Sequence, residues 1–447
     1  MSILADVATT LVKKQPSKKT HVDMSRVCSI ILGGGQGTRL YPLTKRNCKP
    51  AILFGGRFRL VDVPLSNALN SNIHKNYIVT QFLSASLHQH IFHSYRNASP
   101  SRGFIEILGA EQKPEKTNWF KGTADAIRQN LEYLIETPAD YFLILSGDQL
   151  YHMDFQKMVQ TAQEKDVDVL VATLPVNRKD ARRMGIMKVN EDQSIVDFVE
   201  KPQDDDTIDR FVTSSTSLEN MGLAGDSDRN LLGSMGIYLF KRSCLIKLLL
   251  EDMRDDFGKH LIPTKVKSGS IAAFVHDGYW EDIGTIESFY EANIALTRQS
   301  PPFNLYDEAY PITTSHSHLP GTRLINTAVT DSIICEGSHI EAEKVANSIL
   351  GQRTVIKKGT TIEDSYIMGN DFYHLPNHDA HGLPDKLVIE ENCTIKRAII
   401  DKNVFIGKGA KLINKNNLRE YDGQGIYIRD GIIVVQRGAT IPPGFVL

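Results

Sequence analysis

The sequence of 447 residues has few cysteines, no long apolar run and almost no net charge. Its apolar runs are far shorter than the roughly 20 residues that a membrane-spanning helix needs. With 51 basic and 53 acidic residues, the formal net charge is −2. Such balance argues against a protein that coats nucleic acid or a membrane surface. We therefore expect neither nucleic acid nor membrane among its partners.

The five cysteines are widely scattered: Cys28, Cys48, Cys244, Cys335 and Cys393. None forms a C-x-x-C pair, which excludes the common zinc and redox motifs. An odd, sparse set is typical of free thiols in a reducing compartment. The chain also lacks the G-x-S-x-G elbow and the Ser/His/Asp order of hydrolases, which leaves nucleophilic side-chain catalysis without a candidate.

A glycine-rich loop stands out near the N-terminus, directly after the apolar run 27–31. The loop and its flanks comprise Leu32, Gly33, Gly34, Gly35, Gly37, Thr38 and Arg39. Residues without side chains let backbone N–H groups converge on phosphate oxygens. The loop lacks the Lys-Ser or Lys-Thr of a P-loop, and Thr38 stands where a dinucleotide fingerprint needs glycine. It therefore predicts an unusual phosphate site, with a plain tight turn as the alternative.

Residues 25–297 alternate short apolar strands with helical patterns, which predicts an α/β domain with a Rossmann-like, mostly parallel sheet. The expected strands are 27–31, 76–80, 141–145, 167–172 and 271–275. Thr123 is expected to cap one helix, whose apolar face comprises Ala124, Ile127, Leu131 and Leu134. In such a sheet, ligands gather at the carboxyl ends of the strands.

The rest of the chain divides into segments of different composition. Residues 1–24 look like an N-terminal arm, and residues 203–231 like a polar surface insertion without clear periodicity. Residues 298–320, which contain four prolines, are interpreted as a linker.

Residues 321–447 show a six-residue apolar period. It runs through Ile349, Val355, Thr361 and Ile367 and again through Ile400, Ile406 and Leu412. This period is typical of a left-handed parallel β-helix, in which each coil buries its apolar positions by stacking on the next. The segment 372–385 is expected to be a loop outside the coils. Ordinary antiparallel strands are the alternative.

Two carboxylates and two lysines complete the candidate site. Asp148 and Asp282 each follow an expected strand, where a parallel sheet would place its ligands. Two carboxylates together with nucleotide phosphates form a common Mg²⁺ site. Lys49 and Lys201 each precede a proline, which favours an extended conformation that projects the ammonium group.

Taken together, the motifs resemble those of the glucose-1-phosphate adenylyltransferases (ADP-glucose pyrophosphorylases). The segments that carry the resemblance occur in the family's order: 33–40, 49–51, 58–67, 122–126, 146–148, 198–202, 234–238 and 280–285. The resemblance implies transfer of AMP from ATP to α-D-glucose 1-phosphate in glycogen or starch synthesis. It implies a cytoplasmic protein, or alternatively one of the plastid stroma, that forms a homotetramer or a heterotetramer with a related subunit.

The same resemblance implies roles for individual residues. Asp148 and Asp282 would hold Mg²⁺, while Arg39 and Lys49 would face the triphosphate. The sugar phosphate would meet Lys201, Glu200, Gly185 and Ser234, and the glycine loop and Gly122 would line the nucleotide pocket. Anionic metabolite effectors would bind between the domains at Lys45, Arg46, Arg57, Arg59 and Arg437.

Three places depart from the family pattern: Lys121 before Gly122, the segment Lys45-Arg46-Asn47-Cys48 in place of a more basic one, and Gln436-Arg437 where many members carry a lysine. Two rival functions stay open. One is transfer of another nucleotide to glucose 1-phosphate or mannose 1-phosphate. The other is a catalytically silent subunit of the same fold, against which the joint presence of Arg39, Lys49, Asp148, Lys201 and Asp282 argues. An acyltransferase on the β-helix is disfavoured, because the coils hold no histidine in a suitable context.

Overall fold

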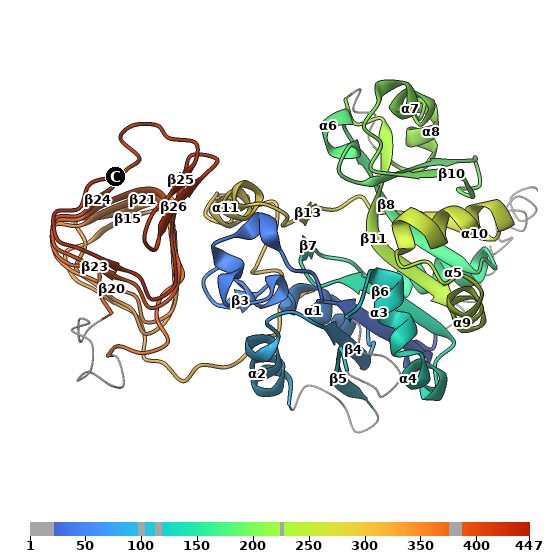
Figure 1. The fold of residues 1–447 in the computed structure, drawn as a ribbon, viewed down its shortest axis with the longest axis horizontal. Coiled ribbons are helices and arrows are strands. Elements are labelled where there is room, and N and C mark those ends of the chain that lie inside the picture. The colour runs from blue at the N-terminus through green and yellow to red at the C-terminus, as the bar shows by residue number, and fades with distance from the viewer. Residues whose placement is uncertain (1–21, 97–102, 112–118, 224–227, 375–386) are drawn as a thin grey trace, which may run out of the picture.

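The computed structural model describes residues 22–96, 103–111, 119–223, 228–374 and 387–447. In these residues an α/β domain lies beside a C-terminal β-helix (Figure 1). Most of the segment interpreted as an N-terminal arm lies outside the described residues. Its last residue, Met24, is buried against the core of the α/β domain.

A nine-stranded sheet forms the centre of the α/β domain. Its path is β10-β9-β11-β6-β1-β4-β5, with β8 between β11 and β12. The strands are β1 (Val27–Leu32), β4 (Lys75–Thr80), β5 (Phe104–Gly109), β6 (Tyr141–Ser146), β8 (Val169–Val176), β9 (Gly185–Val189), β10 (Ile195–Glu200), β11 (Leu231–Lys241) and β12 (Ile271–Val275). Parallel pairs join β6, β1, β4 and β5, and also β8 and β12, while β11 and β9 make antiparallel pairs. The predicted α/β fold is confirmed.

Both faces of this sheet are buried, as expected of a sheet with helices on each side. In β1, Val27 and Ile31 pack into one core cluster, while Cys28 and Ile30 pack into another. The first cluster includes α5 and α2, and the second includes α3 and α9. The helices are α1 (Asp62–Asn70), α2 (Ala85–Tyr95), α3 (Thr123–Gln129), α4 (Leu131–Glu136), α5 (Phe155–Glu164), α6 (Arg178–Ala181), α7 (Asp205–Arg210), α8 (Ser215–Asn220), α9 (Arg242–Glu251), α10 (Ile262–Ser268) and α11 (Ile286–Ala295).

The helix expected after Gly122 forms as two pieces, α3 and α4, which are separated at Asn130. Its four predicted apolar residues are all buried. The predicted cap was wrong, because Thr123 is the first helical residue and its hydroxyl group does not cap the helix. That hydroxyl group accepts a hydrogen bond from the backbone N–H of Phe257 at 3.1 Å.

The segment 203–231 is more regular than the sequence suggested. It contains α7 and α8, which begin after Asp204 and Ser214. Each of these two side chains accepts a hydrogen bond from a backbone N–H three residues later, at 2.7 Å and 3.2 Å respectively. One apolar side chain of each helix, Ile208 and Leu218, is buried. The helices are too short to show a periodicity, but their N-caps were visible in the sequence.

The C-terminal domain is a stack of short strands that pair in parallel, except for the antiparallel pairs within residues 421–435, and the predicted β-helix is confirmed. Its strands are β14 (Arg323–Leu324), β15 (Ala328–Thr330), β16 (Ile333–Ile334), β17 (His339–Ile340), β18 (Lys344–Ala346), β19 (Ile349–Leu350), β20 (Val355–Ile356), β21 (Thr361–Ile367), β22 (Thr394–Ile400), β23 (Phe405–Ile406), β24 (Lys411–Leu412), β25 (Tyr421–Asp422), β26 (Ile426–Arg429), β27 (Ile432–Val435) and β28 (Thr440–Ile441). Successive coils pair Lys344 with Thr361, and Thr361 with Thr394. The long second interval contains the predicted loop, of which residues 375–385 lie outside the described part.

The predicted frame of the six-residue period was wrong by one residue at Ile349, Val355 and Thr361, but Ile367 lies in the interior of the β-helix as predicted. Leu350, Ile356 and Ile362 fill the interior of the β-helix. Val355 and Thr361 are only partly buried, and Ile349 packs outward into the core that joins the two domains. Adjacent apolar residues at 349–350 and at 355–356 made both frames possible there. The later frame, Ile400, Ile406 and Leu412, lies in the interior as predicted.

The two domains share an apolar core. From the α/β domain it contains Phe54, which belongs to the hairpin of β2 (Leu53–Phe54) and β3 (Phe58–Arg59), and Phe289 of α11. From the β-helix it contains Tyr366 and Ile399. The Tyr366 hydroxyl group also accepts a hydrogen bond from the backbone N–H of Gly56 at 3.3 Å. Among the described helices, none is both long and apolar enough to cross a membrane.

The corrected frame predicts how unequally neighbouring residues contribute to stability. Ile362→Ala should lower the free energy of unfolding by about 2–5 kcal/mol, because it leaves a cavity inside the coil. Thr361→Ala, one residue away and partly exposed, should cost much less. Thermal unfolding of both variants tests the frame, and equal losses would contradict it.

Candidate active site

A cleft opens at the carboxyl ends of β1, β4 and β6, as the parallel sheet predicted. Its volume is about 510 Å³. Seven of the predicted site residues line it: Leu32, Gly34, Gly35, Gly122, Asp148, Glu200 and Lys201. The strand ends therefore gather residues that lie far apart in the sequence, and the cleft is large enough for a small-molecule substrate.

The glycine loop forms one wall of the cleft. Gly33 continues the strand, because its N–H donates to the Val79 carbonyl at 2.8 Å. Gly37 has a φ of +62°, and a Cβ there would lie 2.9 Å from Thr44 Cγ2. Glycine is therefore required at this turn for both conformation and space. Thr38 and Arg39 follow in the 3₁₀-helix η2 (Thr38–Leu40), where both are exposed.

Gly122 stands on the opposite wall, at a very close backbone contact. A Cβ there would lie 2.4 Å from the Asp255 carbonyl oxygen. That oxygen accepts hydrogen bonds from the N–H groups of Ala124 and Asp125, at 2.8 and 3.1 Å. Gly122 was predicted to permit a close approach. The group that approaches it is the Asp255 carbonyl of the same chain, at the beginning of α3.

Asp148 and Asp282 lie close together, as predicted. One ammonium group lies near both: Lys49 Nζ is 2.5 Å from Asp148 Oδ2 and 3.5 Å from Asp282 Oδ1. Ser146 also donates a short hydrogen bond to Asp148. Asp282 is brought here by the pairing of β13 (Trp280–Asp282) with β7 (Gln149–Tyr151).

The electrostatic environments of these two carboxyl groups differ. Burial opposes the ionisation of Asp148, but the charge and hydrogen bond of Lys49 outweigh it and lower the pKa of Asp148. For Asp282, burial dominates and raises the pKa, although Lys49 and Arg39 act against it. Lys49 itself is buried, which would lower its pKa, but the two carboxylates raise it. The ion pair of Lys49 with Asp148 is therefore the stronger of the two.

Arg39 reaches this group from the glycine loop. A Cβ placed on Gly284 would lie 3.1 Å from Asp282 Oδ2 and 3.3 Å from Arg39 Nη2, so both groups border the same glycine. Arg39 is exposed, which leaves its guanidinium group accessible to an anion. Lys49, by contrast, is only 9% exposed and is engaged by the carboxylates.

The donors here fit a divalent cation. Two carboxylates that share one ammonium group are close enough to share one metal ion, and oxygen ligands suit Mg²⁺. Within the described residues, no group of three or more His, Cys, Asp or Glu side chains could hold a metal. The remaining ligands would have to come from water and substrate phosphates, as is usual for Mg²⁺.

Three of the four sugar-side residues of the prediction, Gly185, Glu200 and Lys201, lie together, and Glu200 and Lys201 line the cleft. Cβ atoms on Gly185 and on Gly258 would each lie 2.7 Å from Glu200 Oε2, so two glycines make room for this carboxylate. Burial raises the pKa of Glu200, although Lys201 acts against it. Lys201 Nζ lies 3.2 Å from Glu200 Oε1, and 55% of the Lys201 side chain is exposed.

The pre-proline argument for both lysines was wrong. Lys201 has a φ of +48°, in the left-handed region, where its N–H donates to the Met184 carbonyl at 3.0 Å. Lys49 begins the 3₁₀-helix η4 (Lys49–Ala51). Tertiary hydrogen bonds and packing override the local preference at both sites. A positive φ in a non-glycine residue stores strain, which often marks a functional site.

Ser234 lies in β11 beside the cleft but does not line it. It is 7% exposed, and its hydroxyl group accepts a hydrogen bond from the Gly236 N–H at 3.2 Å. Gly236, with a φ of +69°, and Tyr238 line the cleft instead. Ser234 therefore supports an irregular part of β11, where the pairing with β8 shifts register between Ser234 and Tyr238.

Several cleft residues were missed by the sequence analysis. Gln149 follows Asp148 directly and links two elements, because its amide donates to the Met235 carbonyl at 2.8 Å and accepts from Trp280 Nε1 at 3.2 Å. The position of Gln149 directly after the candidate carboxylate Asp148 was the signal in the sequence that could have identified it as a cleft residue. Other missed cleft residues are Gln81, Phe82, Phe120, Asp256, Phe257 and Gly258.

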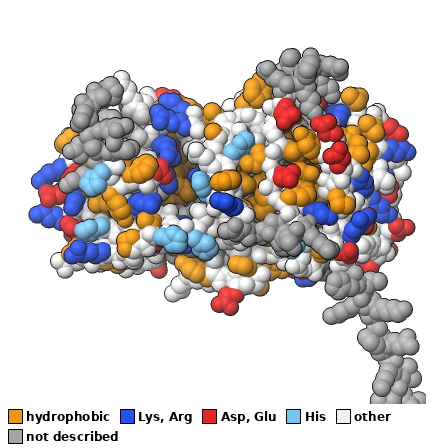
Figure 2. All heavy atoms as spheres, turned by 90° about the horizontal axis from the view of Figure 1, so that it is seen from below, with side chains coloured by type: hydrophobic (Ala, Val, Ile, Leu, Met, Phe, Trp, Pro, Cys, Tyr) orange, Lys and Arg blue, Asp and Glu red, His pale blue; other side chains and the backbone are white. Residues whose placement is uncertain are grey.

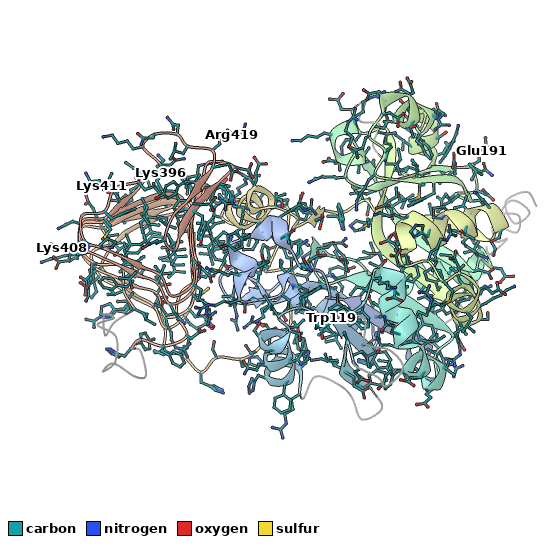
Figure 3. The ribbon with its side chains drawn as sticks, in the orientation of Figure 1. Trp119, Glu191, Lys396, Lys408, Lys411 and Arg419 are labelled. Atoms are coloured by element: carbon teal, nitrogen blue, oxygen red, sulfur yellow. The ribbon has the colours of Figure 1, made fainter. Side chains whose placement is uncertain are left out.

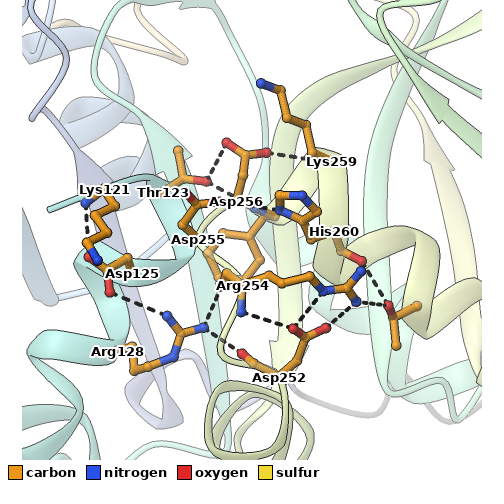
Figure 4. A network of polar contacts seen from close by, with 12 residues as sticks. Lys121, Thr123, Asp125, Arg128, Asp252, Arg254, Asp255, Asp256, Lys259 and His260 are labelled. Atoms are coloured by element: carbon orange, nitrogen blue, oxygen red, sulfur yellow. Dashed lines mark hydrogen bonds and ion pairs between the residues drawn. The ribbon is translucent and has the colours of Figure 1, made fainter.

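A polar network holds Asp256 in place (Figure 4), and the backbone N–H of Phe257 donates to Thr123 of the same network. Arg128 of α3 donates to the carbonyl groups of Leu249, Asp252 and Arg254, at 2.6–2.9 Å. Thr123 meets Asp256 at 3.3 Å. The network fixes the segment before the π-helix η5 (Phe257–Leu261) against α3, and π-helical turns are frequent at functional sites. No local pattern in the sequence signals it.

The predicted effector residues are only partly brought together. Arg59 and Arg437 line one small cavity between the domains, along with two residues that the prediction missed, Asp401 and Lys402. Lysine and arginine side chains gather where the β-helix approaches the α/β domain (Figure 2). Lys45 donates to Gln436 Oε1 at 3.0 Å, next to Arg437.

The other three predicted effector residues, Lys45, Arg46 and Arg57, do not line this cavity. Arg57 lies 3.7 Å from Glu336 Oε1 and donates to the Ser315 carbonyl at 3.4 Å. Arg46 is exposed. The interdomain site is therefore smaller than predicted on the N-terminal side, and it draws more of its charge from the β-helix.

The opposite pKa shifts predict opposite effects on stability at pH 7 without metal. Asp148, with a lowered pKa, stabilises the folded chain above its unfolded pKa and loses this as the pH falls through its folded pKa. Asp282, with a raised pKa, destabilises the folded chain increasingly as the pH rises above its unfolded pKa, and fully above its folded pKa. Asp148→Asn should therefore cost about 3 kcal/mol by leaving Lys49 without its main partner, while Asp282→Asn should cost nothing or stabilise. Thermal unfolding in a chelator tests this, and equal losses would contradict it.

Comparison with known families agrees with this geometry. Residues 28–299 match the family model described as nucleotidyl transferase. Residues 317–446 match a second model, described as the GLGC left-handed parallel beta-helix domain. The first match alone covers more than half of the chain. The chain therefore belongs to the nucleotidyl transferase family and has the two-domain architecture of the glucose-1-phosphate adenylyltransferases.

Proposed function

We propose that the protein transfers AMP from ATP to α-D-glucose 1-phosphate, which yields ADP-glucose and pyrophosphate. The observation that carries the proposal is the carboxylate pair Asp148 and Asp282, of which Asp148 lines the cleft beside the glycine loop and Asp282 is linked to it through Lys49. The GLGC type of β-helix favours this member of the family over other nucleotidyl transferases.

This reaction suits a site without a general base. The nucleophile is an oxygen of the sugar phosphate, which is already anionic. The main barrier is the approach of two polyanions, and positioned cations lower it by orienting and neutralising them. We assign the role of orienting and neutralising the phosphates to Arg39 and Lys49 at the triphosphate and to Lys201 at the sugar phosphate.

The two ends of the cleft divide the substrates between them. Arg39 is exposed beside Asp282 and would stabilise the departing pyrophosphate. Lys201 and Glu200 lie at the other end, where the Lys201 ammonium would bind the phosphate of glucose 1-phosphate and Glu200 would accept hydrogen bonds from the sugar. Gly34 and Gly35 leave room for the nucleotide along the connecting wall.

Asp148 and Asp282 would hold the Mg²⁺ ion that this chemistry requires. When bound, the ion would polarise the α-phosphate and neutralise charge on the leaving group. Lys49 lies where the two carboxylates converge, so it would keep them together before the metal binds.

We further propose that anionic metabolites regulate the enzyme through the interdomain cavity of Arg59 and Arg437. The enzyme would act in glycogen or starch synthesis, in the cytoplasm or the plastid stroma. It would do so as a homotetramer or as a heterotetramer with a related subunit.

A nucleotide panel tests the proposed reaction. Pyrophosphate release by the purified chain, with Mg²⁺ and glucose 1-phosphate, should be fastest with ATP among ATP, UTP, dTTP and GTP. Preference for another nucleotide would assign the chain to a different sugar nucleotide. No release with any of them, alone or with anionic effectors, would favour the silent-subunit alternative.

Two substitutions should separate binding from catalysis. Lys201→Ala should raise the KM for glucose 1-phosphate about 10- to 100-fold, the value of one charged hydrogen bond, with a smaller effect on kcat. Asp148→Ala should mainly lower kcat. The exposed Lys188 of β9 provides the matched control as Lys188→Ala. A kcat within about threefold of wild type in Asp148→Ala, a change under about 1 kcal/mol, would overturn the metal role.

A further inference from the structure

We propose that Asp371 is a built-in counter-ion that occupies the place of an anionic effector and holds the enzyme in its less active state. The inference rests on the proposed effector site and adds to it an internal competitor for that site. It requires that the cations of the cavity are already satisfied, that a ligand cannot enter without displacing Asp371, and that the cavity is connected to the catalytic residues.

Asp371 satisfies the cations of the interdomain cavity. One carboxylate oxygen accepts from Lys402 Nζ at 2.7 Å, and the other accepts from Asn403 Nδ2 at 2.9 Å and from the guanidinium group of Arg437. Burial alone would raise the pKa of Asp371, but Lys402 and Arg437 lower it to about 2. The carboxylate therefore stays ionised at any physiological pH.

Lys402, the lysine that pairs with Asp371, is much less exposed than Lys396 and Lys408 of the same β-helix. Lys396 and Lys408 point outward, away from the α/β domain (Figure 3), and 55% and 63% of their side chains are exposed. Lys402 is 13% exposed. A buried ammonium group needs a counter-charge, and Asp371 provides it from within the same domain.

The cavity itself has almost no free space. Its volume is about 20 Å³, which is room for about one ordered water molecule and too little for a phosphate group. A phosphate group could approach Lys402 and Arg437 only by taking the place of the Asp371 carboxylate. Asp371 approaches Lys402 and Arg437 from outside this lining, whereas Asp401 lines the cavity itself; Asp401 is buried, and burial raises its pKa to about 6.

The cavity is joined to the catalytic carboxylates through a single helical turn. Arg59 lines the cavity and donates to the Ala51 carbonyl at 2.5 Å. Ala51 is the last residue of η4, and Lys49, which pairs with Asp148 and Asp282, is its first. An anion that draws Arg59 toward the cavity would therefore act on the turn that positions Lys49.

Substitution of the counter-ion tests the proposal. Asp371→Asn keeps the shape and removes the charge, and it should bind inorganic phosphate about tenfold more tightly, within the range typical of coupled sites. Phosphate affinity is measured by thermal shift, which does not depend on turnover. Glu363→Gln is the matched control, because Glu363 also pairs with two lysines of the β-helix, Lys344 at 2.7 Å and Lys396 at 3.4 Å, but not at this cavity. It should bind phosphate as the wild type does.

A second variant guards against loss of folding in Asp371→Asn. Asn403→Gly removes one donor to Asp371 and suits the φ of +60° at this position. It should also strengthen phosphate binding, and it should raise pyrophosphate release without effector. Unchanged phosphate affinity in a folded Asp371→Asn, or in Asn403→Gly, would overturn the proposal. Absence of any turnover in the wild type would instead overturn the proposed function, since the phosphate measurement is independent of it.

Discussion

The shared contact of Lys49 with Asp148 and Asp282 is the interaction on which the rest of the site depends. Two carboxylates this close would repel each other, and burial makes the repulsion stronger. One ammonium group between them keeps both in place. Lys49 comes from η4, Asp148 follows β6 and Asp282 belongs to β13. Their contact therefore requires that the central sheet and the β13–β7 pair both form correctly.

The β-helix contributes to this arrangement although it holds none of the catalytic candidates. Its outer face joins a core with Phe54 of the β2–β3 hairpin and Phe289 of α11. The hairpin carries Arg59, whose guanidinium group is hydrogen-bonded to the end of η4. The backbone N–H of Arg59 also donates to Asp62 Oδ2 at 2.8 Å, at the beginning of α1. The interface between the domains is therefore linked through Arg59 and η4 to Lys49 in the candidate active site.

Much of the fold could be predicted because the burial of a strand or coil determines the pattern of apolar residues along it. Strands buried on both faces gave continuous apolar runs, as in β1 and β6, and strand ends gave the positions of Asp148 and Asp282. The prediction failed where the sequence allowed two frames of the six-residue period in the β-helix. Ile349 and Leu350 are both apolar, and only the neighbouring domain explains why Ile349 points outward.

The parts of the site that could not be predicted depend on contacts between distant segments. Lys201 has a positive φ that its following proline does not favour, and Arg57 is engaged by Glu336, which is 279 positions later in the chain. The segment of Asp256 and Gly258 faces the cleft because Arg128 holds its preceding carbonyl groups. None of these contacts leaves a local pattern in the sequence.

The central claim is attack by glucose 1-phosphate on the α-phosphorus of ATP. The most direct measurement uses glucose 1-phosphate labelled with ¹⁸O in its phosphate group, with products followed by ³¹P NMR. The proposed reaction places the label in ADP-glucose, including the bridging oxygen, and none in the pyrophosphate. Label in the pyrophosphate, or no ADP-glucose from ATP in the presence of Mg²⁺, would contradict it.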